Sequence, residues 1–137
     1  MNAEISEGLS VEEAQSLNQN LESFNHSITQ RDESPLRLAA RDPKSGDMVG
    51  GLNGIAGMDW LYVHVLWVDE EHRKTGIGSE LMHEAESLAK DRGCKSSCLT
   101  TFSFQALEFY LALGYEVFGE LKDYPEGHDL YFLKKVL

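Results

Sequence analysis

Residues 68–79 hold the side chains of this 137-residue chain that are best placed for chemistry, and they read V-D-E-E-H-R-K-T-G-I-G-S. The stretch runs from the end of a hydrophobic segment into the start of a helical pattern. Glycines let the backbone turn several N–H groups toward one point, and a helix N-terminus adds roughly half a positive charge. Arg73 and Lys74 add full charges. We therefore expect a phosphate or pyrophosphate to bind here.

A tight strand-to-helix turn, with glycines that serve geometry alone, is the plainer explanation of a single Gly-x-Gly. Two familiar nucleotide motifs do not fit this stretch. A Rossmann fingerprint needs glycine where Leu81 stands, and a P-loop needs Gly-Lys-Ser/Thr, which is absent. The pattern that is present is Arg-x-x-Gly-x-Gly, formed by Arg73, Gly76 and Gly78.

A second pattern lies at residues 106–115, which read A-L-E-F-Y-L-A-L-G-Y. Together the two patterns resemble the signatures of the GNAT superfamily of N-acetyltransferases: the coenzyme A pyrophosphate loop, and Ala-x-x-Phe-Tyr-x-x-x-Gly-Phe. Two motifs in the right order weigh far more than either alone, and the resemblance covers residues 36–137. One departure is Ser103, which stands where the family often has Asn, three residues before the Ala of the second motif.

The resemblance implies acetyl transfer from acetyl-CoA to a primary amine, by direct attack in a ternary complex without an acyl-enzyme. A splayed strand at residues 66–68 would offer backbone N–H groups to the pantetheine arm and the thioester carbonyl. Tyr110 would be the general acid toward the coenzyme A sulfur, because a phenol with a pKa of about 10 can protonate a thiolate. Without the motif, Tyr110 would be a buried aromatic. The implied cofactor-binding residues are Leu66, Trp67, Val68, Arg73, Lys74, Thr75, Gly76, Ile77, Gly78, Ser79, Ser103 and Tyr110.

The general base that deprotonates the amine has three candidates. His128, in residues 123–128, resembles the histidine on a Pro-rich hairpin of some small GNAT enzymes and ranks first, with an exposed turn histidine as the alternative. His64 is the rival, because Tyr62 shares its strand face and both would line the acceptor cleft, although a core histidine is the plainer explanation. The acidic run at residues 69–71 ranks third, because such runs are usually solvated connectors.

Other catalytic arrangements lack support in the sequence. The stretch H-E-A-E-S at residues 83–87 lacks the second histidine of a zinc protease helix, and the five histidines and two cysteines show no ligand spacing, so we expect no metal. Cys94 and Cys98 begin no helix and have no obvious histidine beside them, so neither is a candidate nucleophile. In a reducing compartment we expect buried thiols rather than a disulfide.

The elements that must position these residues alternate between strand and helix patterns. Helical patterns cover residues 11–24, 76–92 and 105–113, and strand patterns cover residues 36–40, 48–55, 60–68, 97–101, 115–121 and 130–136. Ser10 and Glu13 fit a capping box at the first helix. The aromatic and β-branched run at 60–68 predicts a central strand covered on both faces. This order predicts an α/β fold, a mixed sheet with helices against its faces, in agreement with the GNAT-like acyl-CoA N-acyltransferase fold.

Composition sets the broad class. With 42% hydrophobic and 26% charged residues the chain is an ordinary globular one, and its length predicts one domain over residues 1–137. The net charge is −11, with 7 acidic residues against 1 basic residue in the leader at 1–33, which argues against a nucleic-acid partner. No apolar run reaches membrane length and the first residues lack signal-peptide features, so we expect a cytoplasmic protein with no membrane partner.

The substrate is less constrained than the reaction. An acidic surface favours a cationic acceptor such as a polyamine, an aminoglycoside or a basic peptide, but net charge speaks to encounter rates rather than to identity. The expected partner is thus a small-molecule or peptide amine, and small GNAT proteins often pair as homodimers. Two other classes stay open, a non-catalytic coenzyme A-binding sensor or interaction module and a structural domain without a cofactor, because fold alone does not imply function.

Overall fold

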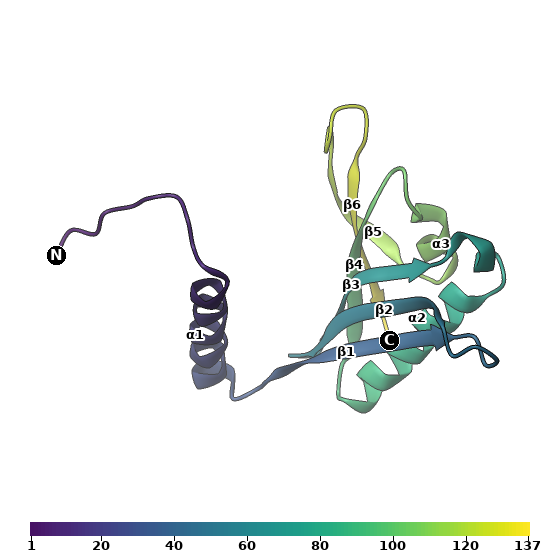
Figure 1. The fold of residues 1–137 in the computed structure, drawn as a ribbon, viewed down its shortest axis with the longest axis horizontal. Coiled ribbons are helices and arrows are strands. Elements are labelled where there is room, and N and C mark those ends of the chain that lie inside the picture. Colours follow the sequence, from purple (N-terminus) through teal and green to yellow (C-terminus); the bar gives the residue numbers. More distant parts are fainter. The chain divides into compact units, whose positions relative to one another are not determined.

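The computed structural model describes residues 1–137 and divides them into two compact units, residues 1–32 and residues 33–137. The single domain over residues 1–137 stays a prediction. The order of elements agrees with the order predicted from the sequence, with one added 3-10 turn (Figure 1). The elements are α1 (Val11–Thr29), β1 (Glu33–Arg41), β2 (Met48–Gly57), β3 (Trp60–Val68), η1 (Glu70–His72), α2 (Ile77–Asp91), β4 (Ser96–Phe102), α3 (Leu107–Ala112), β5 (Glu116–Leu121) and β6 (Leu130–Val136).

The first unit contains α1, which begins with the predicted capping box. The backbone N–H of Glu13 donates to the Ser10 hydroxyl at 3.0 Å, and the Ser10 N–H donates to the Glu13 carboxylate at 2.9 Å. The Ser10 backbone N–H, as the largest cause, and the Ser10 side chain hold the pKa of the Glu13 carboxyl below its ordinary value. The helix continues past its predicted end at residue 24 to Thr29, and Gln30 closes it in the left-handed conformation with φ 55°.

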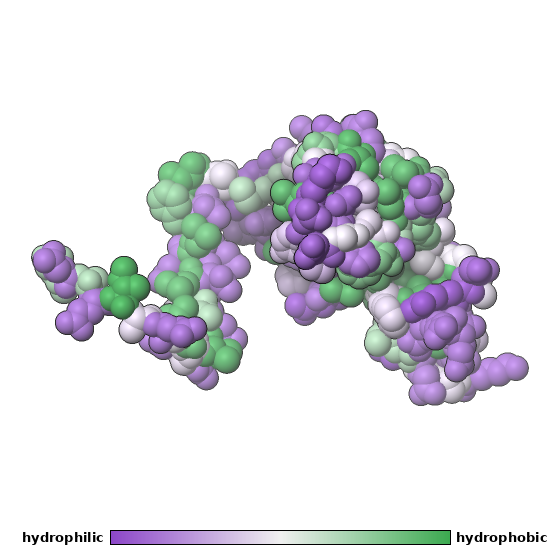
Figure 2. Space-filling view, turned by 90° about the horizontal axis from the view of Figure 1, so that it is seen from above, coloured by the Kyte–Doolittle hydropathy of each residue, from purple (hydrophilic) through white to green (hydrophobic).

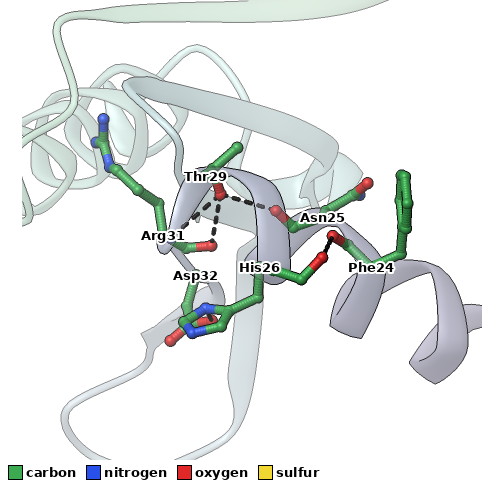
Figure 3. A network of polar contacts seen from close by, with 7 residues as sticks. Phe24, Asn25, His26, Thr29, Arg31 and Asp32 are labelled. Atoms are coloured by element: carbon green, nitrogen blue, oxygen red, sulfur yellow. Dashed lines mark hydrogen bonds and ion pairs between the residues drawn. The ribbon is translucent and has the colours of Figure 1, made fainter.

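Polar contacts order the chain where α1 ends (Figure 3). The Thr29 hydroxyl donates to the Asn25 carbonyl at 3.0 Å and accepts the backbone N–H of Arg31 at 3.1 Å. The His26 ring lies beside Asp32, with 2.7 Å between Nδ1 and the carboxylate oxygen. The exit from the helix is therefore held by side chains of the helix itself, which the hydrophobic pattern alone does not reveal.

The second unit is a six-stranded mixed sheet in the order β1-β2-β3-β4-β6-β5, in which only β3 and β4 run parallel. Helices α2 and α3 contribute side chains to the core on one face of this sheet. The predicted mixed sheet flanked by helices is confirmed. The buried core side chains include Leu36, Leu52, Leu61, Val63, Leu99 and Leu133 from strands, with Met82, Ala85 and Ala89 from α2 and Tyr110 from α3.

A bulge and a splay shape the middle of the sheet. In the ladder between β2 and β3, Val65 pairs with Asn53 and Val63 pairs with Gly54, so His64 has no partner on β2. The pairing of β3 with β4 ends at Val63, although β3 continues to Val68. The backbone groups of β3 that face β4 beyond this point are therefore unpaired with it, and the two strands separate.

Glycines on β2 permit this close pairing. A Cβ atom on Gly54 would lie 2.6 Å from the Tyr62 carbonyl oxygen, and one on Gly50 would lie 2.8 Å from the Trp67 carbonyl oxygen. No side chain fits at either position without a shift of backbone. The close approach of the β3 backbone therefore explains why β2 is rich in glycine.

The prediction that β3 is covered on both faces is wrong. Leu61 and Val63 are buried in the core, but Trp60 is 42% and Val65 is 53% exposed, and His64 is exposed as well. The reason is that α2 and α3 lie against the same side of the sheet, so no other layer formed by residues 33–137 covers the side chains that point the other way. We call this uncovered side the open sheet face; its half-buried or exposed residues are Ile55, Trp60, Tyr62, Cys98, Phe118 and Phe132.

Two smaller observations complete the fold. Cys94 is buried and Cys98 is half-buried, and both are free thiols. Burial raises the pKa of the Cys98 thiol, which keeps it protonated at neutral pH. No helix combines the length and the apolar character needed to cross a bilayer.

Candidate functional site

Two adjoining cavities open where β3 leaves β4. The first, of about 540 Å³, lies along β3 from Val63 to Val68 and reaches β4 at Thr100 and Thr101. The second, of about 610 Å³, is bordered by the start of α2 and by α3. Both are lined by Leu66, Val68, Arg73, Gln105, Ala106 and Tyr110. The splay in the sheet and the two helix ends thus form one continuous cleft.

The glycine loop and the first turn of α2 border the second cavity, as the sequence predicts for an anion site. Lys74, Ile77 and Gly78 line it, and the first N–H groups of α2 have no acceptor within the helix. Gly76 precedes the helix with φ 92°, a conformation that favours glycine. A Cβ on Gly78 would lie 3.2 Å from the Phe109 ring, so this glycine lets α3 approach α2 closely.

Arg73 is held at the junction of the two cavities. Its Nε donates to the Val68 carbonyl at 2.9 Å, and its guanidinium carbon lies 4.6 Å from the centre of the Trp67 ring. Trp67 in turn donates its indole N–H to Asp69 at 3.2 Å. These contacts fix a permanent positive charge at a residue that lines both cavities.

Tyr110 is the central side chain of the cleft. It lines both cavities, although only 8% of its surface is exposed. Burial raises the pKa of its phenol above the ordinary value, and no hydrogen bond within the protein occupies its hydroxyl. Tyr110 is therefore a protonated donor at neutral pH with its hydroxyl left free for a ligand.

Not every residue of the predicted cofactor set lines the cleft. Thr75, Gly76 and Ser79 do not line either cavity. The Thr75 hydroxyl instead donates to the His72 carbonyl and holds the loop closed. Gly76 acts through its backbone conformation. The residues of the set that do line the cleft are Leu66, Trp67, Val68, Arg73, Lys74, Ile77, Gly78, Ser103 and Tyr110.

The two candidate histidines lie in different places. His64, the bulged residue of β3, lines the first cavity, and the Tyr62 ring stacks beside it with 4.5 Å between ring centres. Tyr62 itself does not line a cavity. His128 is exposed in the loop between β5 and β6, where its ring meets the edge of Phe104 at 4.9 Å. Because Phe104 lines the first cavity, His128 lies at the rim of the cleft.

Ser103 joins that loop to the cleft. Its backbone N–H donates to the Asp129 carbonyl at 2.8 Å, and its hydroxyl accepts the Asp129 N–H at 3.0 Å. Ser103 also lines the second cavity. The residue that replaces the family's usual Asn therefore ties the β5–β6 hairpin, with His128, to the end of β4.

Several lining residues escaped the sequence prediction. The Gln105 side chain accepts the Phe102 N–H at 2.8 Å, and it lines both cavities. His72 lines the second cavity, and its Nδ1 is buried without a hydrogen-bond partner. Gln105 and Phe104 stand directly before the second motif, which is the one signal that could have pointed to them. The third-ranked bases, Asp69 with residues 70 and 71, do not line the cleft.

The site contains no cluster of three or more His, Cys, Asp or Glu side chains that could hold a metal ion. The titratable groups of the first cavity are His64, Arg73 and Tyr110. The cleft therefore holds an imidazole, a guanidinium and a phenol that line the same cavity.

Known proteins that resemble the chain show which family it belongs to. The sequence profile of the Acetyltransferase (GNAT) family matches residues 4–115. A blasticidin-S acetyltransferase from Streptomyces morookaense is 41% identical over 93 residues, which is 67% of this chain and 68% of that protein. The crystal structure of an acetyltransferase from Bacillus cereus is 34% identical, with a TM-score of 0.83 over 98% of each chain. A crystal structure from Agrobacterium tumefaciens is 29% identical, with a TM-score of 0.88 over 100% of each chain. The chain therefore belongs to the GNAT acetyltransferase family, whose members use acetyl-CoA.

Proposed function

We propose that this protein is an N-acetyltransferase that moves the acetyl group of acetyl-CoA to a primary amine of a small molecule or peptide by direct attack in a ternary complex. The observation that carries the proposal is the continuous cleft at the β3–β4 splay. One cavity borders an anion-binding helix start, and the other holds His64. A free, protonated Tyr110 hydroxyl stands between them.

The residues present fit a pyrophosphate-bearing thioester. Unpaired N–H groups at the start of α2, with Arg73 and Lys74 beside them, suit the pyrophosphate. The edge of β3 beyond Val63, which pairs with β2 but no longer with β4, suits an extended amide-bearing arm, because such an arm can add hydrogen bonds along a strand edge. Acetyl-CoA supplies an acetyl thioester, which an amine can attack.

The chain's own groups can serve each proton transfer. An alkylammonium has a pKa of about 10, so the amine must lose a proton before it attacks. His64 supports the role of base because it lines the cavity, whereas His128 lies at its rim. Backbone N–H groups of β3 beyond Val63 suit the oxyanion that forms at the carbonyl, and the Tyr110 hydroxyl suits protonation of the departing sulfur.

The acceptor side favours a compact amine with an unsaturated or apolar part. Phe104 lines the first cavity, and the rings of Phe102 and His128 pack against it at 5.0 Å and 4.9 Å. The name of the Streptomyces relative makes blasticidin S the first acceptor to test. We place the enzyme in the cytoplasm as part of the same proposal. No observation favours a non-catalytic sensor.

A calorimetric titration with acetyl-CoA is the first test. The wild type should bind, and Gly78→Trp should lose binding by about 100-fold or more, because a large side chain would fill the second cavity and press on Phe109. Ser45→Trp, which places the same side chain at an exposed position of the distant β1–β2 turn, is the matched control.

Acetylation is then followed by mass spectrometry with blasticidin S, spermidine and a lysine-containing peptide. A product heavier by one acetyl group on one of these amines supports the proposed reaction. Binding of acetyl-CoA without any acetylated amine would contradict it, and would favour the sensor class.

The identity of the base has its own test. His64→Gln should lower kcat/KM near pH 7 by about 100-fold and remove the acidic limb of the pH–rate profile, because that limb reports the base that must be neutral. His128→Gln should keep the limb and change kcat/KM by only a few-fold. If the acidic limb instead disappears in His128→Gln and persists in His64→Gln, His128 is the base and His64 is not.

A further inference from the structure

Four aromatic rings form a continuous series at the rim of the first cavity. Phe102 and Phe104 stack almost parallel, with 5.0 Å between ring centres and 15° between ring planes. Tyr124 lies 5.6 Å from Phe102, and His128 lies 4.9 Å from Phe104. Phe102 ends β4 and Phe104 follows it, whereas Tyr124 and His128 belong to the β5–β6 loop. We call these four residues the aromatic rim.

Residues 33–137 leave much of the aromatic rim uncovered. Phe104 is 57% and Tyr124 is 51% exposed, and Phe104 also lines the first cavity. Figure 1 shows the β5–β6 loop at the top, and Figure 2 looks onto that side from above, where hydrophobic side chains lie at the surface among hydrophilic ones. An apolar patch with polar surroundings is typical of a binding site. The position of this patch, at the mouth of a cavity, points to a ligand of that cavity.

The loop that carries two of the rings is held in place by hydrogen bonds. The Tyr124 N–H donates to the His128 carbonyl at 2.8 Å, and the His128 N–H donates to the Pro125 carbonyl at 2.9 Å. The two bonds between Ser103 and Asp129 join this loop to the turn after β4. Rings that are already in position lose little conformational freedom when a ligand binds, so the rim is preorganised.

The geometry of the rim suits a flat ring better than a bulky aliphatic group. Aromatic rings prefer offset-stacked or edge-to-face contacts, with ring centres about 4.5–7 Å apart. Both kinds of contact are present at Phe104, which stacks with Phe102 and meets His128 edge-on. A ligand ring can extend this series on the exposed part of Phe104. A saturated ring of the same size has no π system and gains only the burial of apolar area.

The charge of the same loop suits a cation. Asp123, Glu126 and Asp129 place three carboxylates in it, and the Lys122 ammonium is paired with Glu120 at 2.6 Å. Carboxylates beside a cavity raise the local concentration of cations and repel anions. The loop therefore favours a protonated amine over an anionic compound with the same ring.

We propose that the aromatic rim binds the part of the acceptor that does not react, and that the acceptor is a protonated amine joined by a short chain to a flat aromatic or heteroaromatic ring. The ring stacks on Phe104, and the amine reaches into the first cavity, which His64 also lines. This inference rests on the proposed function, because the first cavity is an acceptor site only if an amine is acetylated there.

Two matched amines test the proposal by binding, which needs no turnover. 2-Phenylethylamine and 2-cyclohexylethylamine carry the same amine on the same chain, but only the first has a flat aromatic ring. The cyclohexyl compound is the more hydrophobic, so apolar burial alone predicts that it binds more tightly. In calorimetric titrations of the full chain with coenzyme A present, we expect instead that 2-phenylethylamine has a Kd about 5-fold lower.

Phe104→Leu keeps an apolar side chain but removes the ring, so the two amines should then have Kd values within about 2-fold of each other. Phe118→Leu is the matched control, because Phe118 is 55% exposed and lies on the open sheet face outside both cavities. This variant should keep the wild-type preference. Equal or tighter binding of the cyclohexyl amine to the wild type, or a preference that persists in Phe104→Leu, would overturn the proposal.

The sign of the ligand charge is tested with 3-phenylpropionate, which has the same ring and chain with a carboxylate in place of the amine. It should bind at least about 10-fold more weakly than 2-phenylethylamine. Equal binding of the anion would contradict the preference for a cation and overturn this part of the proposal.

Turnover of the same two amines is measured separately by mass spectrometry. Binding with the expected preference but no acetylation of any amine contradicts the proposed function, and the acceptor role of the aromatic rim falls with it. Acetylation of both amines with equal kcat/KM overturns the role of the aromatic rim alone and leaves acetyl transfer in place.

Discussion

Replacing Tyr110 with phenylalanine is expected to lower kcat by about 100-fold or more while leaving the affinity for acetyl-CoA nearly unchanged. The substitution removes one oxygen from a side chain that lines both cavities and whose hydroxyl makes no hydrogen bond within the protein. Packing of the ring against its neighbours is kept, so the fold should keep its stability. The loss should therefore appear in the chemical step.

Steady-state kinetics with saturating acetyl-CoA measure this loss, and calorimetry measures the affinity. Tyr131→Phe removes the hydroxyl of a half-buried tyrosine outside the cavities and should keep kcat within a few-fold. Since burial raises the pKa of Tyr110, the acid stays protonated as pH rises through neutrality. Any alkaline limb that it causes belongs above pH ~10. An unchanged kcat in Tyr110→Phe would remove Tyr110 from the mechanism.

Replacing Glu86 with alanine is expected to lower the free energy of unfolding by about 3–5 kcal/mol, because it breaks a buried ion pair and leaves its partner uncompensated. Glu86, on α2, is 7% exposed, and its carboxylate lies 2.7 Å from the Lys135 ammonium on β6. The other carboxylate oxygen accepts the Tyr115 hydroxyl at 2.9 Å, and that hydroxyl also bonds to Ser97 at 2.8 Å. Glu86 thus connects α2 directly with β6 and with Tyr115, which stands just before β5, and through the Tyr115 hydroxyl with Ser97 on β4.

Urea unfolding followed by circular dichroism measures the change. The double variant with Glu86→Met and Lys135→Met is the matched control, because it removes both charges and keeps apolar volume. It should recover most of the lost stability. Glu86→Ala that unfolds at the wild-type urea midpoint would contradict the assigned role.

The same network bears on the active cleft. The Tyr115 N–H donates to the Tyr110 carbonyl at 3.1 Å, and the two rings lie 6.0 Å apart. Burial, as the largest cause, raises the pKa of Tyr115 well above its ordinary value, so its hydroxyl stays a donor to Glu86 at all ordinary pH. The buried pair therefore supports the segment on which Tyr110 is presented to the cleft.

Most of the fold was accessible from local sequence patterns. Helix α2 was predicted at 76–92 and spans Ile77–Asp91, and β6 was predicted at 130–136 and spans Leu130–Val136. Periodicity and glycine stops define these elements because their causes lie within a few residues of one another. The start of α3 was predicted at 105 but lies at Leu107. Gln105 belongs to the turn after β4 and not to the helix, because its side chain accepts the Phe102 N–H.

For the candidate site as well, some features follow from local sequence patterns and others only from the tertiary structure. The sequence by itself determined the family, the glycine loop, and the position of Tyr110, because each depends on a motif that is continuous in the chain. Only the tertiary structure decided that His64 lines the cleft while His128 lies at its rim, that Ser103 holds the hairpin, and that one face of β3 is uncovered. These features arise from a bulge, a splay and contacts between segments far apart in sequence. Their energies come from packing against distant partners, which no local pattern encodes.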